Sequence, residues 1–388
     1  MMITYLDNNA TTQCSPEVID AMRPYFGERY GNPSSMHSFG GKVARDLDAA
    51  RANVAALIGA DAQEIIFTGC GTESNNHALS GAVAALGKKV TLITSAVEHP
   101  AILEPCRQLE LQGHEVIFVG VDGEGRLRMD ELDQALAKSG AKIASFMWAN
   151  NETGVIFPIA EIARRAKAAG ALMHTDAIQA VGKLADINVN TAPVDMLSLS
   201  GHKLHAPKGI GALYVRKGTP LRPFLFGGHQ EKGRRAGTEN VPCIIALGKA
   251  AELMKVEGER PREPNRIARL RDRLQEGLLK TCPDARVNGD TENRLPNTLN
   301  ISFEYIEGES ILLHLSDAGV CASSGSACTS GSLEPSHVLR AMGIPFTALH
   351  GSIRFSLSRE TTDADIDRTL AVMPPIVAKL RALSPFVK

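Results

Sequence analysis

The sequence predicts an α/β protein in which a large domain with a mainly parallel sheet flanked by helices is joined to a smaller α+β domain. From about residue 64 to residue 200, short apolar runs alternate with longer amphipathic stretches. These runs lack internal polar alternation, which is typical of strands buried on both faces and joined by right-handed helical crossovers. Residues 257–264 are charged and carry two prolines, so they indicate a boundary before a second, mixed region.

Each element follows from its local pattern. Strands are predicted at residues 64–68, 90–94, 116–119, 143–148, 171–174 and 196–199, and helices at 72–86, 100–111, 129–137 and 159–169. In the second region, apolar residues spaced along one face predict a helix at 267–278. A strand at 298–303, a helix at 310–315, a strand at 353–357 and a last helix from about 362 follow. Pro374 and Pro375 should kink or interrupt that last helix.

Composition limits the classes of function. The chain has 388 residues, 42 Lys and Arg against 43 Asp and Glu, and a net charge of −1. Such a chain has no overall field to attract nucleic acid or an anionic membrane. No apolar run reaches the ~18 residues of a membrane span, and the N-terminus does not resemble a signal peptide. Seven cysteines without a CxxC pair argue against a disulfide framework. We expect a cytoplasmic enzyme.

Lys203 and Asp176 form the strongest candidate pair. Lys203 comes directly after a predicted strand, where ligands of α/β sheets bind, and a lysine there can form a Schiff base with a carbonyl cofactor. Asp176 ends the preceding predicted strand. An acid that keeps a pyridine nitrogen protonated, together with such a lysine, is the pair that pyridoxal phosphate requires as an electron sink. The alternatives are a solvated surface lysine and an aspartate that caps a loop.

Two further strand ends carry residues suited to a flat, anionic cofactor. Gly71 and Thr72 stand in a glycine-rich turn before a helix, where free backbone N–H groups bind an anion, although helix capping explains the same residues. His99 follows another strand and can stack on a ring or transfer protons, or it is a structural histidine. His202 and His205 suit a metal ion only with a third ligand, which the neighbouring sequence lacks.

Two polar loops and one arginine complete the candidates. Residues 227–240 combine glycines, cations and Thr238, a pattern that suits phosphate binding or a flexible solvated loop. A second loop, rich in Ser and Gly, carries Cys328, and an accessible thiol is what a catalytic thiolate requires. Cys321 is ambiguous, and the other five cysteines fit structural positions. Arg354, in a predicted strand, suits a carboxylate clamp or a surface ion pair.

Taken in order, these motifs resemble the cysteine desulfurases, the NifS-like branch of the class-V aminotransferase relatives that use pyridoxal phosphate, and NifS of nitrogen fixation in particular. The motifs lie at residues 5–12, 31–35, 72, 98–100, 150–154, 176, 203, 234–240 and 328, and so cover essentially the whole chain. The resemblance implies fold type I, with a seven-stranded sheet in a large domain of residues 16–260. Residues 1–15 and 261–388 would form the small domain, which carries the catalytic-cysteine loop.

The resemblance implies a role for each matching residue. Lys203 binds the cofactor, His99 stacks on it and handles protons, and Cys328 takes up sulfur as a persulfide. Asn151 and Arg354 hold the substrate carboxylate. The implied cofactor-binding set is Gly71, Thr72, His99, Asn151, Asp176, Gln179, Ser200, His202, Lys203 and Thr238, of which Thr238 comes from the partner subunit of a homodimer.

Within that set the resemblance places Asp176 at the pyridine nitrogen and Gln179 at the ring hydroxyl oxygen. Thr72, Ser200 and His202 hold the phosphate. The implied reaction converts L-cysteine into L-alanine and a persulfide on the enzyme. The sulfur then passes to an iron–sulfur scaffold protein of the NifU or IscU type, for nitrogenase maturation.

The resemblance also implies a transient [2Fe-2S] cluster bridged by the Cys328 persulfide. Two other interpretations stay open. One is a selenocysteine lyase or a related aminotransferase or lyase, in which Cys328 is incidental. The other is a non-catalytic scaffold protein, against which the set of Lys203, Asp176 and His99 argues. Neither nucleic acid nor a membrane is expected as a partner.

Overall fold

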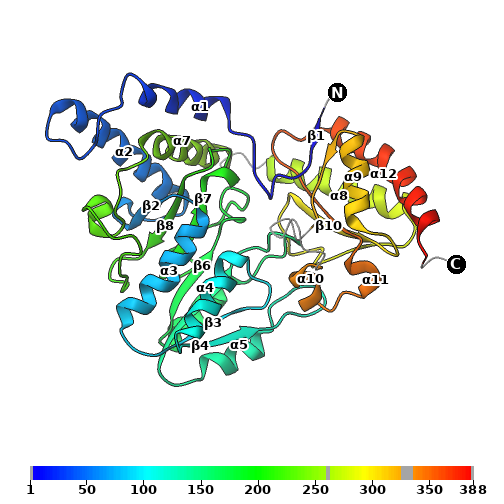
Figure 1. Ribbon diagram of the computed structural model, residues 1–388, viewed down its shortest axis with the longest axis horizontal. Coiled ribbons are helices and arrows are strands. Elements are labelled where there is room, and N and C mark those ends of the chain that lie inside the picture. Colours follow the sequence, from blue (N-terminus) through cyan, green and yellow to red (C-terminus); the bar gives the residue numbers. More distant parts are fainter. Residues whose placement is uncertain (1–2, 259–262, 325–334, 386–388) are drawn as a thin grey trace.

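A seven-stranded sheet forms the centre of the larger of two lobes (Figure 1). The computed structural model describes residues 3–258, 263–324 and 335–385. The strand order is β2-β8-β7-β6-β5-β3-β4, and only β8 runs antiparallel to its neighbours. The predicted mainly parallel sheet of seven strands is confirmed. The strands are β2 (Ile65–Thr68), β3 (Val90–Ser95), β4 (Glu115–Val119), β5 (Ala141–Met147), β6 (Leu172–Asp176), β7 (Met196–Ser200) and β8 (Gly211–Val215).

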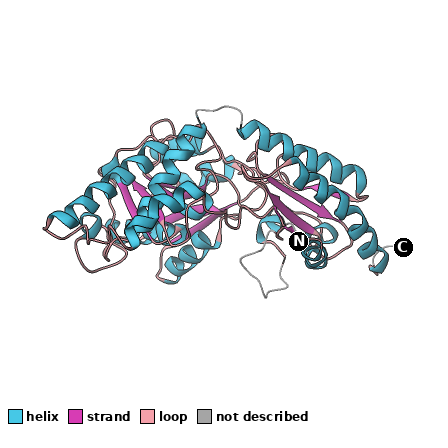
Figure 2. Cartoon of the chain, turned by 90° about the horizontal axis from the view of Figure 1, so that it is seen from above, coloured by secondary structure: helices cyan, strands magenta, loops and turns pink. Residues whose placement is uncertain are grey.

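Both faces of this sheet are covered, as the uninterrupted apolar runs predict. Side chains of neighbouring strand residues point to opposite faces, and so Phe67 and Ile93 join one apolar cluster whereas Ile66 and Leu92 join another. Figure 2 shows the strands between layers of helices. The helices of this lobe are α1 (Pro16–Met22), α2 (Ser38–Leu57), α3 (Gly71–Leu86), α4 (Pro100–Leu111), α5 (Met129–Leu136), α6 (Ile159–Ala168) and α7 (Val241–Gly258), with 3-10 turns η1 (Arg23–Phe26), η2 (Ala62–Glu64), η3 (Gly201–Lys203) and η4 (Gln230–Gly233).

The smaller lobe is built on the antiparallel sheet β12-β10-β9, and the N-terminal strand β1 pairs in parallel with β11 beside it. The chain then crosses from β1 to α1 on the larger lobe (Figure 1). The elements are β1 (Thr4–Tyr5), α8 (Glu263–Thr281), β9 (Ala285–Val287), β10 (Thr298–Phe303), α9 (Gly308–Asp317), β11 (Val320–Cys321), α10 (His337–Ala341), α11 (Phe346–Leu349), β12 (Ser352–Ser356) and α12 (Asp363–Leu383).

The apolar clusters show how the two lobes are held together. Leu6 belongs to the small-lobe cluster with residues of α8, β10 and α12. Val338 and Leu339 of α10, in contrast, pack into the cluster of the large sheet. The predicted domain boundaries, 16–260 against 1–15 and 261–388, stay a prediction. No helix in the described ranges is long and apolar enough to cross a membrane.

The predicted interruption at Pro374 and Pro375 is wrong, because α12 is one helix from Asp363 to Leu383. Each proline removes one helical N–H. The helix nevertheless buries Ile366 and Met373 in the small-lobe cluster. Burial of this kind outweighs the loss of single hydrogen bonds, since tertiary packing supplies most of the stability of a helix in a protein.

Leu6 should contribute strongly to the stability of the small lobe. Its side chain is fully buried, whereas that of Ile3, three residues earlier, is 67% exposed. We expect Leu6→Ala to lower the free energy of unfolding by about 2–5 kcal/mol, the usual cost of a cavity left by leucine. Ile3→Ala is the matched control and should change little. Urea unfolding followed by far-ultraviolet circular dichroism measures both, and equal midpoints for the two variants would contradict the packing.

Candidate active site

Lys203, Asp176 and His99 meet at one edge of the large sheet. His99 follows β3, Asp176 ends β6, and Lys203 ends the turn η3 directly after β7. The carboxyl ends of these parallel strands lie at the same edge. The three groups are close enough for the charges of Asp176 and Lys203 to act on the pKa of His99. The structure therefore brings together the residues that the sequence placed at separate strand ends.

The Lys203 amine is held by the N-terminal segment. Its Nζ donates to the carbonyl oxygens of Asn9, at 2.5 Å, and Ala10, at 2.6 Å. The same segment is fixed to the turn around Lys203, because the backbone N–H and hydroxyl of Thr12 both donate to the carbonyl oxygen of His202, each at 2.9 Å. A lysine held in this way has a defined direction of approach for a carbonyl compound, which is what a Schiff-base lysine needs.

Asp176 is a buried carboxylate at the end of β6. Its oxygens accept from the Asn75 side chain at 2.7 Å and from the backbone N–H of Ile178 at 3.0 Å. Burial raises the pKa of Asp176, and these hydrogen bonds and the charges of His99 and Lys203 oppose the rise. A buried acid of this kind is stabilised by a cationic partner. A protonated pyridine nitrogen is such a partner.

His99 caps the helix α4. Its Nδ1 accepts from the backbone N–H of Ala101 at 3.1 Å, so in the neutral ring the proton sits on Nε2. Burial lowers the pKa of His99, as do the positive charges of Lys203 and His337, against the opposing charge of Asp176. The neutral imidazole is therefore the favoured form, and it can stack on a ring and accept or donate a proton.

An anion fits the space at the start of α3. Gly71 and Thr72 are the first residues of this 16-residue helix, whose N-terminal N–H groups favour negative charge. The hydroxyl of Ser200 is buried there and has no hydrogen-bond partner among the residues that the structure describes. A Cβ on Gly71 would lie 3.2 Å from the Cβ of Ser200 and 2.3 Å from Ile178, so only glycine leaves this space open.

His202 lies beside the same turn. Its Nδ1 and the Thr11 hydroxyl are 3.2 Å apart, and burial, ahead of the charges of Lys203 and Lys208, lowers its pKa to about 4. It is then neutral at physiological pH and can share a hydrogen bond with a phosphate without carrying charge. The free hydroxyl of Ser200, the helix terminus and the neutral ring of His202 together fit a phosphate group.

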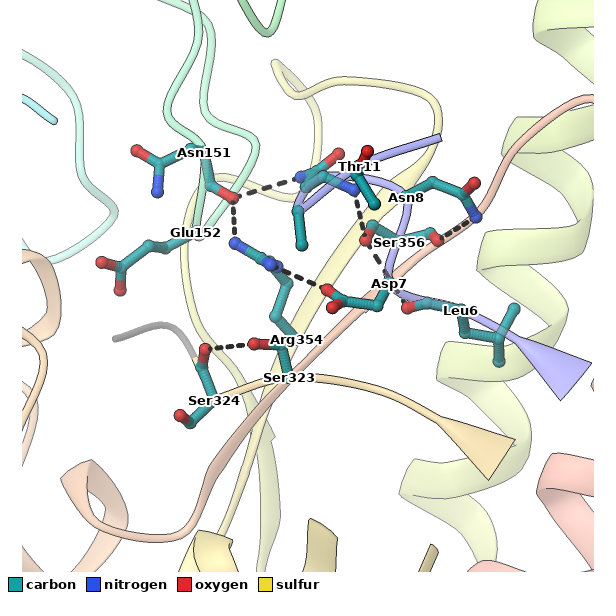
Figure 3. Close-up of polar contacts among 12 residues, drawn as sticks. Leu6, Asp7, Asn8, Thr11, Asn151, Glu152, Ser323, Ser324, Arg354 and Ser356 are labelled. Carbon is teal, nitrogen blue, oxygen red and sulfur yellow. Dashed lines mark hydrogen bonds and ion pairs between the residues drawn. The ribbon is translucent and has the colours of Figure 1, made fainter. Parts of the chain in front are cut away.

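Arg354 of β12 brings the small lobe to this edge (Figure 3). Its guanidinium is buried, and it donates to the carbonyl oxygen of Asn151 at 3.0 Å and to a carboxylate oxygen of Asp7 at 2.9 Å. The guanidinium Nε is buried without a partner. Asn151 contributes this backbone oxygen, and its side-chain amide has no hydrogen bond within the described ranges. The predicted pair of Arg354 and Asn151 is thus in contact.

Contacts with this site hold both ends of the segment that carries Cys328. Before it, Ser323 exchanges two backbone hydrogen bonds with Arg354, at 2.7 and 3.2 Å. After it, the Ser336 hydroxyl donates to the buried carboxylate of Glu152. His337 then bonds to the carbonyl oxygen of Glu98, next to His99, at 2.8 Å. Cys328 itself, with its predicted roles as nucleophile and iron–sulfur ligand, lies outside the described residues.

Thr238 does not join the other predicted residues within this chain. It is exposed in the stretch between η4 and α7 and makes no hydrogen bond to any of them. The metal interpretation of His202 and His205 has no support, because the described residues contain no group of three His, Cys, Asp or Glu side chains that could hold a metal ion. The ring of His205 instead bonds to the carbonyl oxygen of Gln13 at 2.9 Å.

Sequence reasoning gave no individual role to four residues that contact the site. Asp7 and Asn9 lie in the N-terminal motif, Asn75 lies one turn into α3, and Lys183 lies four residues after Gln179. Asp7 contacts Arg354, and Asn9 contacts Lys203. Asn75 contacts Asp176, and Lys183 contacts Gln179. The sequence could have indicated Asn75 and Lys183, since each lies three or four residues from a predicted site residue on the same local turn.

Comparison with known proteins decides the family. The model of the family described as aminotransferase class-V matches residues 4–369. The chain belongs to the class-V aminotransferase family. Its members among known proteins include a cysteine desulfurase of Trichormus azollae, 60% identical over all of this chain and 96% of that protein. The cysteine desulfurase NifS of Azotobacter vinelandii is 55% identical over all of this chain and 95% of its own length.

A solved structure described as a NifS-like protein agrees with this class-V fold. It has a TM-score of 0.91 and 37% identity over 98% of this chain and all of its own. The predicted resemblance to the NifS-like cysteine desulfurases is thus confirmed, as are the fold class and the dependence on pyridoxal 5'-phosphate that the family carries.

Glu98, next to His99, makes the stability of this class-V enzyme depend on pH. Burial raises its pKa from 4.5 to about 8. Between these values the unfolded chain releases the Glu98 proton while the folded chain keeps it. The contribution of Glu98 to the free energy of unfolding is therefore complete below pH 4.5 and is lost as pH rises through 8. We expect the free energy of unfolding to fall between pH 5 and pH 8 by less in Glu98→Gln than in wild type, and the difference should be on the order of 4 kcal/mol.

Glu110→Gln is the control, since Glu110 is an exposed residue of the neighbouring helix α4. Chemical unfolding at several pH values measures all three proteins. Parallel pH profiles of wild type and Glu98→Gln would show that Glu98 is ionised in the folded protein and would contradict its burial as a neutral acid.

Proposed function

We propose that this chain is a cysteine desulfurase that moves the sulfur of L-cysteine onto Cys328. The observation that carries the proposal is the arrangement around one sheet edge. Lys203, Asp176 and His99 lie there, Arg354 of the small lobe faces them, and contacts at Ser323 and Ser336 hold both ends of the segment with Cys328 against the same edge.

The residues at this edge suit pyridoxal phosphate. Thr72, Ser200 and His202 would hold its phosphate, and the missing Cβ of Gly71 would leave room for that phosphate. Asp176 would pair with the ring nitrogen, and Lys203 would carry the covalent bond. Bound there, the cofactor supplies an electron sink for the bonds at the α and β carbons of the amino acid. The burial that raises the pKa of Asp176 is offset when a cation binds beside it.

Arg354 and His99 act on the substrate in this scheme. The guanidinium of Arg354 binds a carboxylate with two parallel hydrogen bonds once Asp7 yields part of the contact, and its unpartnered Nε supplies one donor. His99, neutral with a proton on Nε2, moves protons at the reacting carbons.

Cys328 is the sulfur acceptor. Its thiolate would attack the substrate sulfur and the carbon–sulfur bond would break, with the electron pair of that bond left on the carbon skeleton of the substrate. Proton uptake then gives L-alanine. L-cysteine and the Cys328 thiol become L-alanine and a Cys328 persulfide, so atoms and electrons balance without another oxidant. Cys328 follows Ser324 by four residues, and the buried pair of Ser336 and Glu152 closes the segment.

The downstream steps are part of the same proposal. An iron–sulfur scaffold protein of the NifU or IscU type would take the persulfide sulfur, and nitrogenase would be the final client. The likeness to a protein with the name NifS supports this role. A [2Fe-2S] cluster on the Cys328 sulfur would be cargo in this transfer. Thr238, exposed and apart from the site of its own chain, would complete the phosphate site of the partner in a homodimer.

Persulfide mapping tests the nucleophile. After L-cysteine is added to the holoenzyme, mass spectrometry of its peptides should find one extra sulfur atom on the peptide with Cys328. Cys328→Ala should keep the cofactor and release no sulfide, because no thiol is left to attack the substrate sulfur. Cys321→Ala is the matched control, since Cys321 is a half-buried thiol of β11 only seven positions away. It should keep full activity.

Two results would overturn the assignment. One is a persulfide found mainly on Cys321. The other is full sulfide release by Cys328→Ala. Conversion of L-cysteine into its keto acid, with neither alanine nor persulfide, would favour the aminotransferase interpretation, and alanine formed from L-selenocysteine but not from L-cysteine would favour the selenocysteine lyase interpretation.

A further inference from the structure

Lys183 lies inside the candidate site, although the proposed mechanism gives it no role. Its Nζ donates to the side-chain oxygen of Gln179 at 2.5 Å and to the side-chain oxygen of Asn9 at 3.0 Å. Lys203 reaches the backbone oxygen of the same Asn9 at 2.5 Å. Two lysines therefore converge on one asparagine of the N-terminal segment.

The amine of Lys183 is held without an acidic partner. No carboxylate lies within ion-pair distance of it in the described part of the chain, and its two recorded contacts are neutral amide oxygens. Burial lowers the pKa of Lys183 well below its usual value, and the positive charges of Lys203 and Arg354 lower it further. Buried lysines are ordinarily paired, because an unpaired buried charge is costly. The free-energy cost of holding this amine without an acidic partner indicates that Lys183 has a role in the site.

The contacts of Lys183 set the direction of two amides. A side-chain amide has an oxygen that accepts and a nitrogen that donates, and it can turn over if nothing distinguishes its two ends. The Nζ of Lys183 donates to the side-chain oxygen of Gln179, and this contact holds the oxygen on the side of Lys183. The Gln179 nitrogen must then face the other way, and it donates to the backbone oxygen of Asn9 at 3.0 Å, on the side where Lys203 lies.

Asn9 is fixed by the same logic. Its side-chain oxygen accepts from Lys183 and from the amide nitrogen of Asn297 at 3.1 Å. Its nitrogen donates to the hydroxyl of Thr298 at 2.9 Å and to the backbone oxygen of Asn151 at 3.2 Å. With Asn9 held in this orientation, its backbone oxygen stays in reach of Lys203.

We propose that Lys183 is a positioning residue, which fixes the amide of Gln179 so that an N–H points at the ring oxygen of the cofactor, and which fixes Asn9 so that its carbonyl oxygen holds Lys203. The inference rests on the proposed function, because it assigns Lys183 to the same pyridoxal phosphate site. It acts through Gln179 and Asn9, not by contact with the reacting atoms.

Cofactor retention and the visible absorption of the holoenzyme test this role. Loss of the absorption band during dialysis against buffer without pyridoxal phosphate gives a rate of cofactor loss. We expect Lys183→Met to lose cofactor about tenfold faster than wild type, since the two hydrogen bonds that orient Gln179 and Asn9 are removed. The absorption maximum should also shift, because the ring oxygen loses its oriented donor. Lys183→Arg keeps two donors and a charge and should stay within about threefold of wild type.

Two further variants separate positioning from a general effect of charge or folding. Lys217→Met removes one positive charge from an exposed residue two positions after the end of β8, and it should behave as wild type. Gln179→Ala alone should speed cofactor loss, and adding Lys183→Met to it should add less than the effect of Lys183→Met in wild type, because part of the action of Lys183 passes through Gln179. Thermal unfolding of each holoenzyme checks the fold, and Lys183→Gln replaces Lys183→Met if the latter does not fold.

Wild-type rates and absorption in Lys183→Met would overturn the inference, as would additive effects of the Gln179 and Lys183 changes. Failure of the proposed function has a different signature. Wild type would then bind no pyridoxal phosphate, or it would bind the cofactor and form no Cys328 persulfide from L-cysteine.

Discussion

The hydrogen bonds of Asn9 are the interaction on which both the site and the arrangement of the two lobes depend. This residue is buried, and its backbone oxygen accepts from Lys203 and Gln179 of the large lobe. Its side chain bonds to Asn297 and Thr298 of the small lobe. A single residue near the N-terminus thus joins Lys203 to the sheet that carries Arg354. If Asn9 moved, Lys203 and the small lobe would lose the contact that they share.

The hydrogen bonds of Asn9 explain why the chain starts on the small lobe and continues on the large lobe. Pairing of β1 with β11 and burial of Leu6 fix the start of the chain on the small lobe. The contacts of Thr12 fix its continuation on the turn around Lys203. Between these two points the backbone oxygens of Asn9 and Ala10 have no strand partner, and so they are available to accept from lysine. The crossing therefore serves the chemistry as well as the packing.

Much of the fold could be predicted from the sequence, because buried parallel strands leave uninterrupted apolar runs. Strand ends gave Asp176, His99 and Lys203 for the same reason, since ligands bind where such strands end. The strand β8 was not predicted, because it is the antiparallel strand that the crossover pattern does not require. The prolines of α12 misled the prediction because the packing of Ile366 and Met373 is visible only in three dimensions.

The unpredicted part of the site has one physical cause. Asp7 and Asn9 act across about 170 to 350 positions of sequence, and their partners are set by the crossing between lobes. No local pattern reports such a contact. Gly71 shows the opposite case, since a glycine at a strand-to-helix turn is visible in the sequence. The structure adds only that a Cβ at this position would meet Ile178 and Ser200.

The central claim is that Lys203, held by the Asn9 and Ala10 carbonyl oxygens, is the lysine that binds pyridoxal phosphate, although Lys183 shares Asn9 with it. Borohydride reduction of the holoenzyme fixes the carbon–nitrogen bond between lysine and cofactor, and mass spectrometry of the peptides then locates it. The account predicts that the modification is found on the peptide with Lys203 and that the peptide with Lys183 is unmodified. Modification of Lys183, or of neither lysine, would contradict it.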